Sequence, residues 1–143
     1  MDERPIGVFD SGLGGLTVVK ELLTELPNES IVYFGDTARL PYGTRSREIV
    51  TKYSAQCVRF LLSKGIKMVV IACNTVSSNS LEALHAQFDI PILGVIRPGA
   101  RAAADATRNG RIGVIGTLGT IRSKAYPNAI RGINPDLLVL DEA

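Results

Sequence analysis

The sequence offers little support for a disulfide-stabilised or membrane-bound protein. Only two of its 143 residues are cysteine, too few for a disulfide framework, which favours a reducing compartment. No apolar run approaches the roughly 20 residues that a membrane-spanning helix requires. The N-terminal stretch MDERPIGVFD begins charged and lacks the apolar core of a signal peptide. We therefore expect a cytoplasmic protein that does not use a membrane.

An excess of charge of one sign is also missing. Sixteen Lys and Arg residues against fourteen Asp and Glu give a formal net charge of +2, and these residues are scattered, so no nucleic-acid partner is required. The single histidine, His85, is interpreted as a solvated or capping residue, and no metal site is predicted. With 45% hydrophobic residues the chain is predicted to be globular, with one core and part of a second.

The most informative stretch that is present covers residues 68–78, MVVIACNTVSS. Its apolar run predicts a buried parallel strand, and Asn74 and Thr75 are suitable N-caps for one helix over the segment that follows, SSNSLEALHAQF. Cys73 would then lie where a strand meets a helix N-terminus, a position that binds ligands in open α/β sheets and favours a thiolate. A buried structural cysteine is the alternative.

A second strand-turn-helix pattern starts at residues 5–9, PIGVF, and continues through Asp10, Ser11 and the glycines of GLGG. The stretch GLGGLT departs from the dinucleotide fingerprint because the third glycine would fall on Thr17. The glycines could instead let backbone amides and the side chains of Asp10 and Ser11 approach a small ligand. A tight turn with Asp10 as a solvated helix cap remains the alternative.

The strand predicted at 30–34 is followed by a long loop, GDTARLPYGTRS, which offers Pro41, Tyr42 and Gly43 as a rigid, approachable turn. The alternative is a surface loop in which Asp36 and Arg39 merely pair. An amphipathic helix is predicted over 45–63, with Cys57 on its buried face as a core residue.

The rest of the chain continues the alternation of strand and helix. Strands are predicted at 90–96, 111–116 and 137–140, and helices at 101–109 and 123–131. Thr117 and Thr120, after the middle strand, suit either a carboxylate or phosphate ligand or an ordinary turn. Five or six strands alternating with helices predict an α/β fold, a doubly wound, Rossmann-like parallel sheet with right-handed crossovers.

Four motifs together carry a family resemblance: GVFDSGLGGLTV, YFGDTARLPYG, ACNT and GTLGTI. In this order they resemble the N-terminal half of bacterial glutamate racemases, with aspartate racemases as near neighbours. The resemblance implies a cofactor-independent enzyme that interconverts L- and D-glutamate, supplies D-glutamate for cell-wall peptidoglycan, and has two similar α/β domains around its active site. On this basis residues 1–97 would form the first domain and 98–143 the beginning of the second. A homodimer is compatible with the resemblance.

The resemblance also implies roles for single residues. Cys73 resembles one of two acid/base thiols, and Asp10 and Ser11 resemble the pair near the substrate ammonium, where Asp10 could help to relay a proton. The remaining matches are to substrate-binding groups. Asn74 and Thr75 resemble the residues that bind the substrate carboxylate, and Pro41, Tyr42 and Gly43 resemble the loop that lines the pocket. Thr117 and Thr120 resemble hydroxyls that face the pocket from the second domain.

One departure from the family is large. Its second catalytic cysteine lies in a Gly-Cys-Thr-His segment of the C-terminal half, which this sequence does not contain, and Cys57 on a helix face cannot replace it. We therefore expect a fragment that is poorly stable and inactive alone. Two alternatives stay open: a racemase for aspartate or another small acid, and a Rossmann-like nucleotide- or anion-binding module in which Asp36 contacts a ribose.

Overall fold

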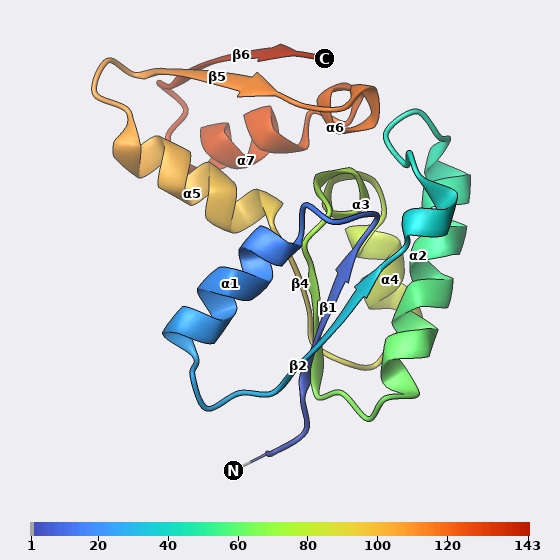
Figure 1. The fold of residues 1–143 in the computed structure, drawn as a ribbon. Coiled ribbons are helices and arrows are strands. Elements are labelled where there is room, and N and C mark those ends of the chain that lie inside the picture. The colour runs from blue at the N-terminus through green and yellow to red at the C-terminus, as the bar shows by residue number, and fades with distance from the viewer. Residues whose placement is uncertain (1) are drawn as a thin grey trace.

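Parallel strands form two separate sheets in the computed structural model, which describes residues 2–143 (Figure 1). The first sheet has the order β2-β1-β3-β4, and the second pairs β5 with β6. The strands are β1 (Ile6–Asp10), β2 (Ile31–Gly35), β3 (Met68–Ile71), β4 (Ile92–Gly94), β5 (Arg111–Ile115) and β6 (Leu138–Glu142). The predicted parallel α/β class is confirmed, but the strands do not share one sheet. We call residues 6–94 the four-stranded unit and residues 96–142 the two-stranded unit.

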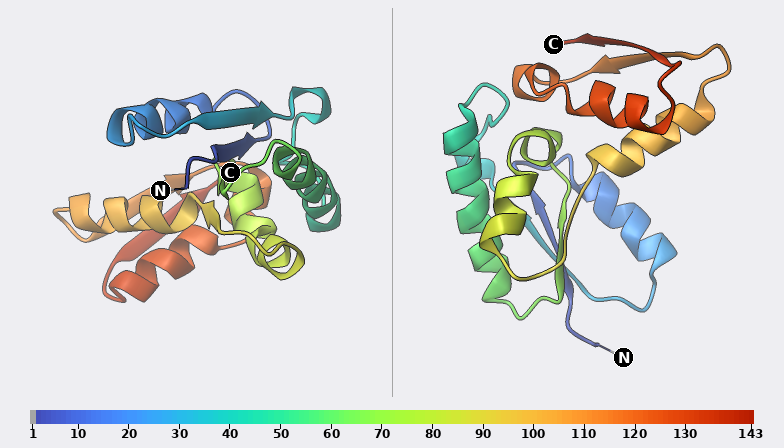
Figure 2. Two further views of the ribbon diagram at one scale, coloured as in Figure 1. Left: turned by 90° about the horizontal axis from the view of Figure 1, so that it is seen from below. Right: turned by 180° about the vertical axis from the view of Figure 1, so that it is seen from behind.

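Helices cover both faces of the sheet in the four-stranded unit (Figures 1 and 2). On one face, Ile6 and Val8 pack against α1 (Leu16–Glu25). On the other face, Phe9 belongs to a larger core that includes α2 (Arg47–Leu62), α3 (Asn74–Asn79) and α4 (Leu81–Gln87). All five residues of β1 are consequently buried, as expected for a central strand of a parallel sheet.

Strand register places the ends of β1 and β3 side by side. Phe9 pairs with Ile71, and the amide of Ala72 donates to the carbonyl of Phe9 at 2.8 Å. Asp10 and Cys73 therefore emerge at the same edge of the sheet. Carboxyl ends of neighbouring parallel strands are the usual ligand position in such folds.

The two-stranded unit is covered on one face only. Helices α5 (Ile96–Ala106) and α7 (Ala125–Ile133) lie under the sheet, and the short α6 (Leu118–Arg122) follows β5. Its core consists of Ala100, Ile130, Leu137 and Val139 with partly buried neighbours. The opposite face exposes apolar side chains, with Ile115 88% and Leu140 65% accessible.

Several predicted boundaries were wrong. The helix expected after Cys73 breaks at Ser80 into α3 and α4. Two buried serines make tertiary hydrogen bonds there: the Ser77 hydroxyl donates to the Ile71 carbonyl at 3.1 Å, and Ser80 Oγ lies 2.8 Å from Thr51 Oγ. These bonds compete with a continuous helix.

Two further boundaries differ from the prediction. Strand β4 ends at Gly94, and α5 begins at Ile96 and not at residue 101, because Pro98 falls in the first turn, where its missing amide costs nothing. The segment around 118–133 forms two helices where one was predicted. The division at 97/98, which falls inside α5, stays a prediction. Within residues 2–143, no helix combines the length and apolar character needed to cross a membrane.

Candidate active site

A cavity of about 490 Å³ opens where the end of the four-stranded sheet faces the two-stranded unit. The predicted residues Asp10, Ser11, Cys73, Asn74, Thr75 and Thr117 all line it. The structure therefore brings together side chains from the ends of β1, β3 and β5. Its other lining residues include Gly14, Gly15, Thr17, Val95, Gly99 and Tyr126.

Cys73 occupies the N-cap position of α3 in extended backbone geometry, with φ −88° and ψ 122°. Its side chain is mostly buried, and the thiol donates to the hydroxyl of Ser11 at 3.3 Å. Asn74 and Thr75 were predicted as N-caps, but they lie one and two residues inside the helix, and no side chain caps α3. Their polar groups are thereby left to face the cavity and the neighbouring unit.

The carboxylate of Asp10 organises the glycine-rich turn. Its Oδ1 accepts from the amide of Ser11 at 2.8 Å, and its Oδ2 accepts from the amide of Gly15 at 2.9 Å. A β-carbon at residue 15 would lie 2.7 Å from Asp10 Cβ, so glycine is required for this approach. Asp10 is 6% exposed, and the predicted alternative of a solvated cap was wrong.

Tyr33 supports this turn and was not identified from the sequence. Its hydroxyl donates to the carbonyl of Gly12 at 2.7 Å and lies 3.5 Å from Asp10 Oδ2. Burial, with the nearby Asp10 charge, raises the pKa of Tyr33 to about 12. A β-carbon at Gly35 would lie 2.3 Å from the Gly12 carbonyl, so the end of β2 passes directly against the turn. The alternation of SIVYF indicated a strand but gave no sign of this contact.

Threonine hydroxyls join the two units beside the cavity. Thr75 Oγ1 lies 2.9 Å from Thr117 Oγ1, which lies 3.1 Å from Thr120 Oγ1 and caps α6 by accepting from the Thr120 amide. Gly43 packs against the same threonine: a β-carbon there would lie 2.4 Å from Thr117 Cβ. The Gly119 amide also donates to the Gly43 carbonyl at 2.9 Å. Thr120 is thus one hydrogen bond away from the cavity wall.

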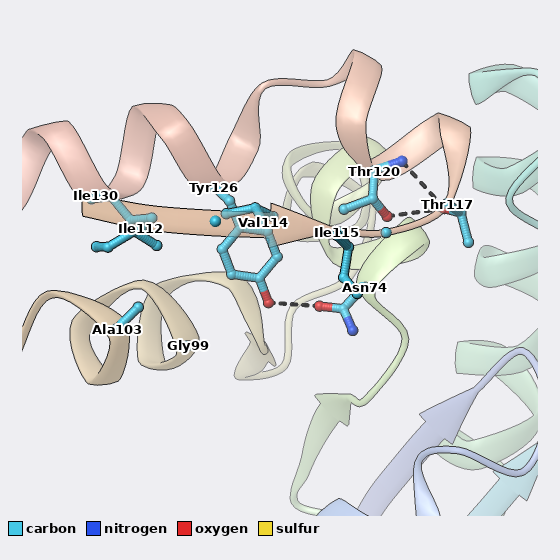
Figure 3. A pocket seen from close by; sticks show the side chains of 12 residues that line it. Asn74, Gly99, Ala103, Ile112, Val114, Ile115, Thr117, Thr120, Tyr126 and Ile130 are labelled. Carbon is cyan, nitrogen blue, oxygen red and sulfur yellow. Dashed lines mark hydrogen bonds between the residues drawn. The ribbon is translucent and has the colours of Figure 1, made fainter. Parts of the chain in front are cut away.

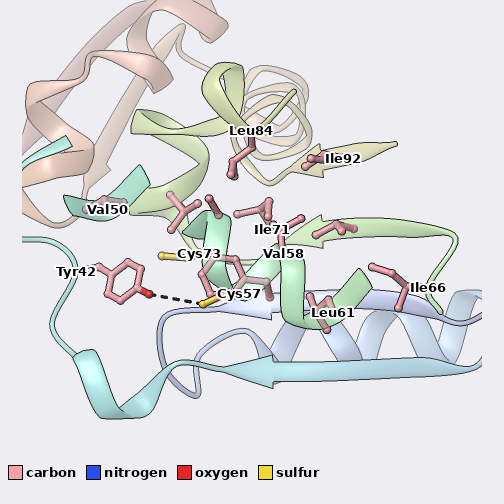
Figure 4. Packing of buried hydrophobic residues seen from close by; sticks show 14 residues of the cluster. Tyr42, Val50, Cys57, Val58, Leu61, Ile66, Ile71, Cys73, Leu84 and Ile92 are labelled. Carbon is pink, nitrogen blue, oxygen red and sulfur yellow. Dashed lines mark hydrogen bonds between the residues drawn. The ribbon is translucent and has the colours of Figure 1, made fainter. Parts of the chain in front are cut away.

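Tyr42 does not line the Cys73 cavity, and its hydroxyl lies 4.0 Å from Cys57 Sγ in the core (Figure 4). Its buried hydroxyl donates to Asp36, which also forms an ion pair with Arg39 at 2.6 Å. Cys57 Sγ lies 3.8 Å from the same carboxylate, and burial raises the pKa of the Cys57 thiol to about 11. Asp36 and Arg39 do pair, but Asp36 is buried and not on a surface loop as that alternative had it. The predicted burial of Cys57 is confirmed.

The loop that carries Pro41, Tyr42 and Gly43 does not contribute to the wall of the 490 Å³ cavity. Gly43 reaches it only through Thr117, and the Pro41 carbonyl accepts from Arg45 Nε at 3.3 Å. Substrate contacts by these three residues stay a prediction.

Tyr126 lines the cavity and was not identified from the sequence. It belongs to the first turn of α7, and its hydroxyl donates to Asn74 Oδ1 at 2.7 Å (Figure 3). Tyr126 and Asn74 also line an adjoining, mostly apolar cavity of about 430 Å³. The two residues are 52 positions apart in the sequence, and nothing in the residues around Tyr126 distinguishes it from a tyrosine that packs in the core.

A family model described as Asp/Glu/hydantoin racemase matches residues 6–137. The chain belongs to this family. A glutamate racemase of Geobacter metallireducens is 57% identical over all 143 residues, which correspond to 53% of that protein. The chain therefore spans about half the length of the curated relatives it matches.

Solved structures of the racemase family have the same fold. A glutamate racemase isoform from Bacillus anthracis is 48% identical with a TM-score of 0.95, over 100% of this chain and 54% of that one. Glutamate racemase from Francisella tularensis, solved in complex with D-glutamate, is 45% identical with a TM-score of 0.88, over 99% of this chain and 53% of that one.

A racemase must remove a proton from the carbon that it inverts, so it needs a base. The cavity presents one thiol, that of Cys73, among polar groups. Cys73 has a hydroxyl neighbour in Ser11, a carboxylate lies on the β1 side, and amide and hydroxyl donors lie on the α3 side. The arrangement can hold a small zwitterion with its reacting carbon near a sulfur atom.

Proposed function

We propose that the protein is a glutamate racemase in which Cys73 is one of two acid/base thiols. The observation that supports this most directly is the position of the Cys73 thiol, at the end of β3 between a carboxylate and a set of neutral donors. This polarity matches an α-amino acid, which carries an ammonium and a carboxylate on the carbon that loses its proton.

The two sides of the cavity suit the two charges of the substrate. Asp10 uses its carboxylate oxygens on the amides of Ser11 and Gly15, yet it keeps a negative charge that favours an ammonium group nearby. Asn74 and Thr75 offer an amide and a hydroxyl for the substrate carboxylate. The α-carbon would then lie between them, facing Cys73.

Inversion at this carbon requires two proton transfers on opposite faces. The Cys73 thiolate takes the α-proton, the C–H electron pair stays on carbon as a carbanion, and a second thiol returns a proton from the other face. In the opposite direction the Cys73 thiol donates. Ser11, 3.3 Å from the sulfur, can donate a hydrogen bond to the thiolate form.

Cys57 does not qualify as the second thiol. It is 1% exposed, and its sulfur faces Asp36 and Tyr42 in the core, away from the cavity. We infer that the second thiol belongs to the half of the relatives' length that these 143 residues do not span, so the isolated chain should not racemise glutamate. We also propose a cytoplasmic enzyme that supplies D-glutamate for peptidoglycan, and a homodimer as its assembly.

A nucleotide-binding module is less well supported. In phosphate-binding turns, free backbone amides receive the anion, whereas here the amides of Ser11 and Gly15 are bonded to Asp10. Asp36, the residue expected at a ribose, is buried with Arg39 and Tyr42.

The test is D-glutamate formation from L-glutamate by the native gene product, whatever its length. Cys73→Ala should reduce the rate by at least about a thousandfold, because it removes the thiol proposed as the acid/base group at this face. Cys57→Ala, the matched cysteine control, should keep activity within about threefold. Turnover unaffected by Cys73→Ala would contradict the role of this thiol. Turnover of aspartate in place of glutamate would leave the chemistry intact and change the substrate.

A further inference from the structure

Tyr126 makes a contact that core packing does not require. Its ring packs with the core of the two-stranded unit, but its hydroxyl extends to the exposed side chain of Asn74 on the other unit. Figure 3 shows the Asn74 amide with its oxygen toward Tyr126 and its nitrogen on the far side. In this arrangement the hydroxyl donates to the amide oxygen, which leaves the Nδ2 group of Asn74 free to donate elsewhere.

The hydroxyl is itself held in place. A β-carbon at Gly99 would lie 3.1 Å from the Tyr126 hydroxyl oxygen and 3.2 Å from Cε1, so α5 and the phenol ring are in close contact. A phenol is protonated at neutral pH, and burial raises the pKa of Tyr126 further, so the hydroxyl is available as a donor. The ring is thus confined between α5 and Asn74.

We propose that Tyr126 is a positioning residue that fixes the side-chain amide of Asn74, so that the Nδ2 group is presented to the Cys73 cavity as a hydrogen-bond donor. This inference rests on the proposed function, in which Asn74 binds the substrate carboxylate. Asn74 is exposed and carries a rotatable amide, which without a partner would sample orientations that present an acceptor to the carboxylate. An amide that is already ordered loses less conformational entropy when the substrate binds.

The predicted consequence concerns binding more than turnover. Ordering one side chain is worth a factor of roughly two to ten in affinity. Tyr126→Phe removes the hydroxyl and keeps the ring, so it should raise the KM for glutamate about three- to tenfold while kcat stays within twofold. Tyr53→Phe is the matched control: within residues 2–143 the Tyr53 hydroxyl makes no hydrogen bond, and its KM should not change.

A second variant reaches the same contact from the other side. Gly99→Ala improves helix propensity in α5 and should therefore fold, yet its methyl group lies 3.1 Å from the Tyr126 hydroxyl oxygen and should shift the ring slightly, which weakens the bond to Asn74. It should raise KM as Tyr126→Phe does, and the two changes combined should add little to either one alone.

A double-mutant cycle on the native gene product separates positioning from general structure. In an Asn74→Ala background, Tyr126→Phe should have no further effect on KM, because the group that it positions is gone. Independent, additive effects in that background, or an unchanged KM in both Tyr126→Phe and Gly99→Ala, would overturn the inference. Absence of racemisation in the wild type would instead refute the proposed function, so the two failures are distinguishable.

Discussion

The two units of the molecule follow the same strand-and-helix pattern but differ in how their sheets are covered. In the four-stranded unit helices lie on both faces, and β1 is buried along its whole length. In the two-stranded unit the face that carries Ile115 and Leu140 is open. The comparison shows that the well-covered unit carries Asp10 and Cys73, whereas Thr117 and Tyr126 reach the same cavity from the less covered unit.

The largest expected effect comes from deleting equally buried side chains in the two cores. Leu61→Ala, in the large core, should lower the free energy of unfolding by about 3–5 kcal/mol, and Ile130→Ala, in the small core, by about 2–3 kcal/mol. The smaller core can collapse more easily around the lost atoms. Urea denaturation followed by circular dichroism measures both, and equal losses would mean that the two cores are equally well packed.

A substitution where Gly43 meets Thr117, which we call the seam, should weaken the contact between the two units. Gly43→Ala places a methyl group 2.4 Å from Thr117 Cβ, and relieving that overlap should cost about 1–3 kcal/mol of unfolding free energy. Gly113→Ala is the matched control, since a β-carbon there meets nothing within 4 Å. Hydrogen exchange should accelerate in β5 and α6 for the first variant alone. Unchanged exchange in Gly43→Ala would show that the seam does not hold the units together.

Opposite faces of one strand provide a comparison inside the two-stranded unit. Val139→Thr introduces a hydroxyl into the small core and should cost about 1–3 kcal/mol of unfolding free energy. Leu140→Thr, on the open face, should change it by less than about 0.5 kcal/mol. Thermal melts of both variants measure the difference. A large loss in Leu140→Thr would reveal that something covers this face in solution.

Alkaline pH should act mainly on the four-stranded unit. The Cys57 thiol has its pKa raised from about 9 to about 11, so folding favours the protonated form. The contribution of this thiol to the free energy of unfolding is complete below pH 9 and declines as pH rises toward 11, because the thiol ionises at lower pH in the unfolded chain. The urea midpoint of the wild type should therefore fall more between pH 9 and 11 than that of Cys57→Ala. Parallel declines would contradict this assignment.

The sequence predicted the features that depend on local pattern. Cys73 was correctly expected at the end of a strand and Cys57 in the core, because an apolar run and a helical period identify such positions directly. The parallel α/β class also followed from the alternation of strands and helices.

Features that depend on contacts distant in sequence were missed. Nothing near Tyr33 or Tyr126 indicates that their hydroxyls meet Gly12 and Asn74, which lie 21 and 52 residues away. The break at Ser80 was missed for the same reason, because the Thr51 hydroxyl that it contacts belongs to α2. The bond between the Tyr42 hydroxyl and the buried Asp36 was likewise not predicted, whereas a substrate contact by Tyr42 stays a prediction.

The central position of β1 has a consequence for the order in which the chain folds. One neighbour, β2, begins 25 residues after β1. The other neighbour, β3, does not begin until 62 residues after β1, where Ile6 pairs with Met68. At about 5–20 residues per second, the ribosome needs roughly 3–12 s to make that interval. An apolar strand with one unpaired edge is exposed throughout this time, which makes its protection by chaperones a factor in how much folded protein a cell recovers.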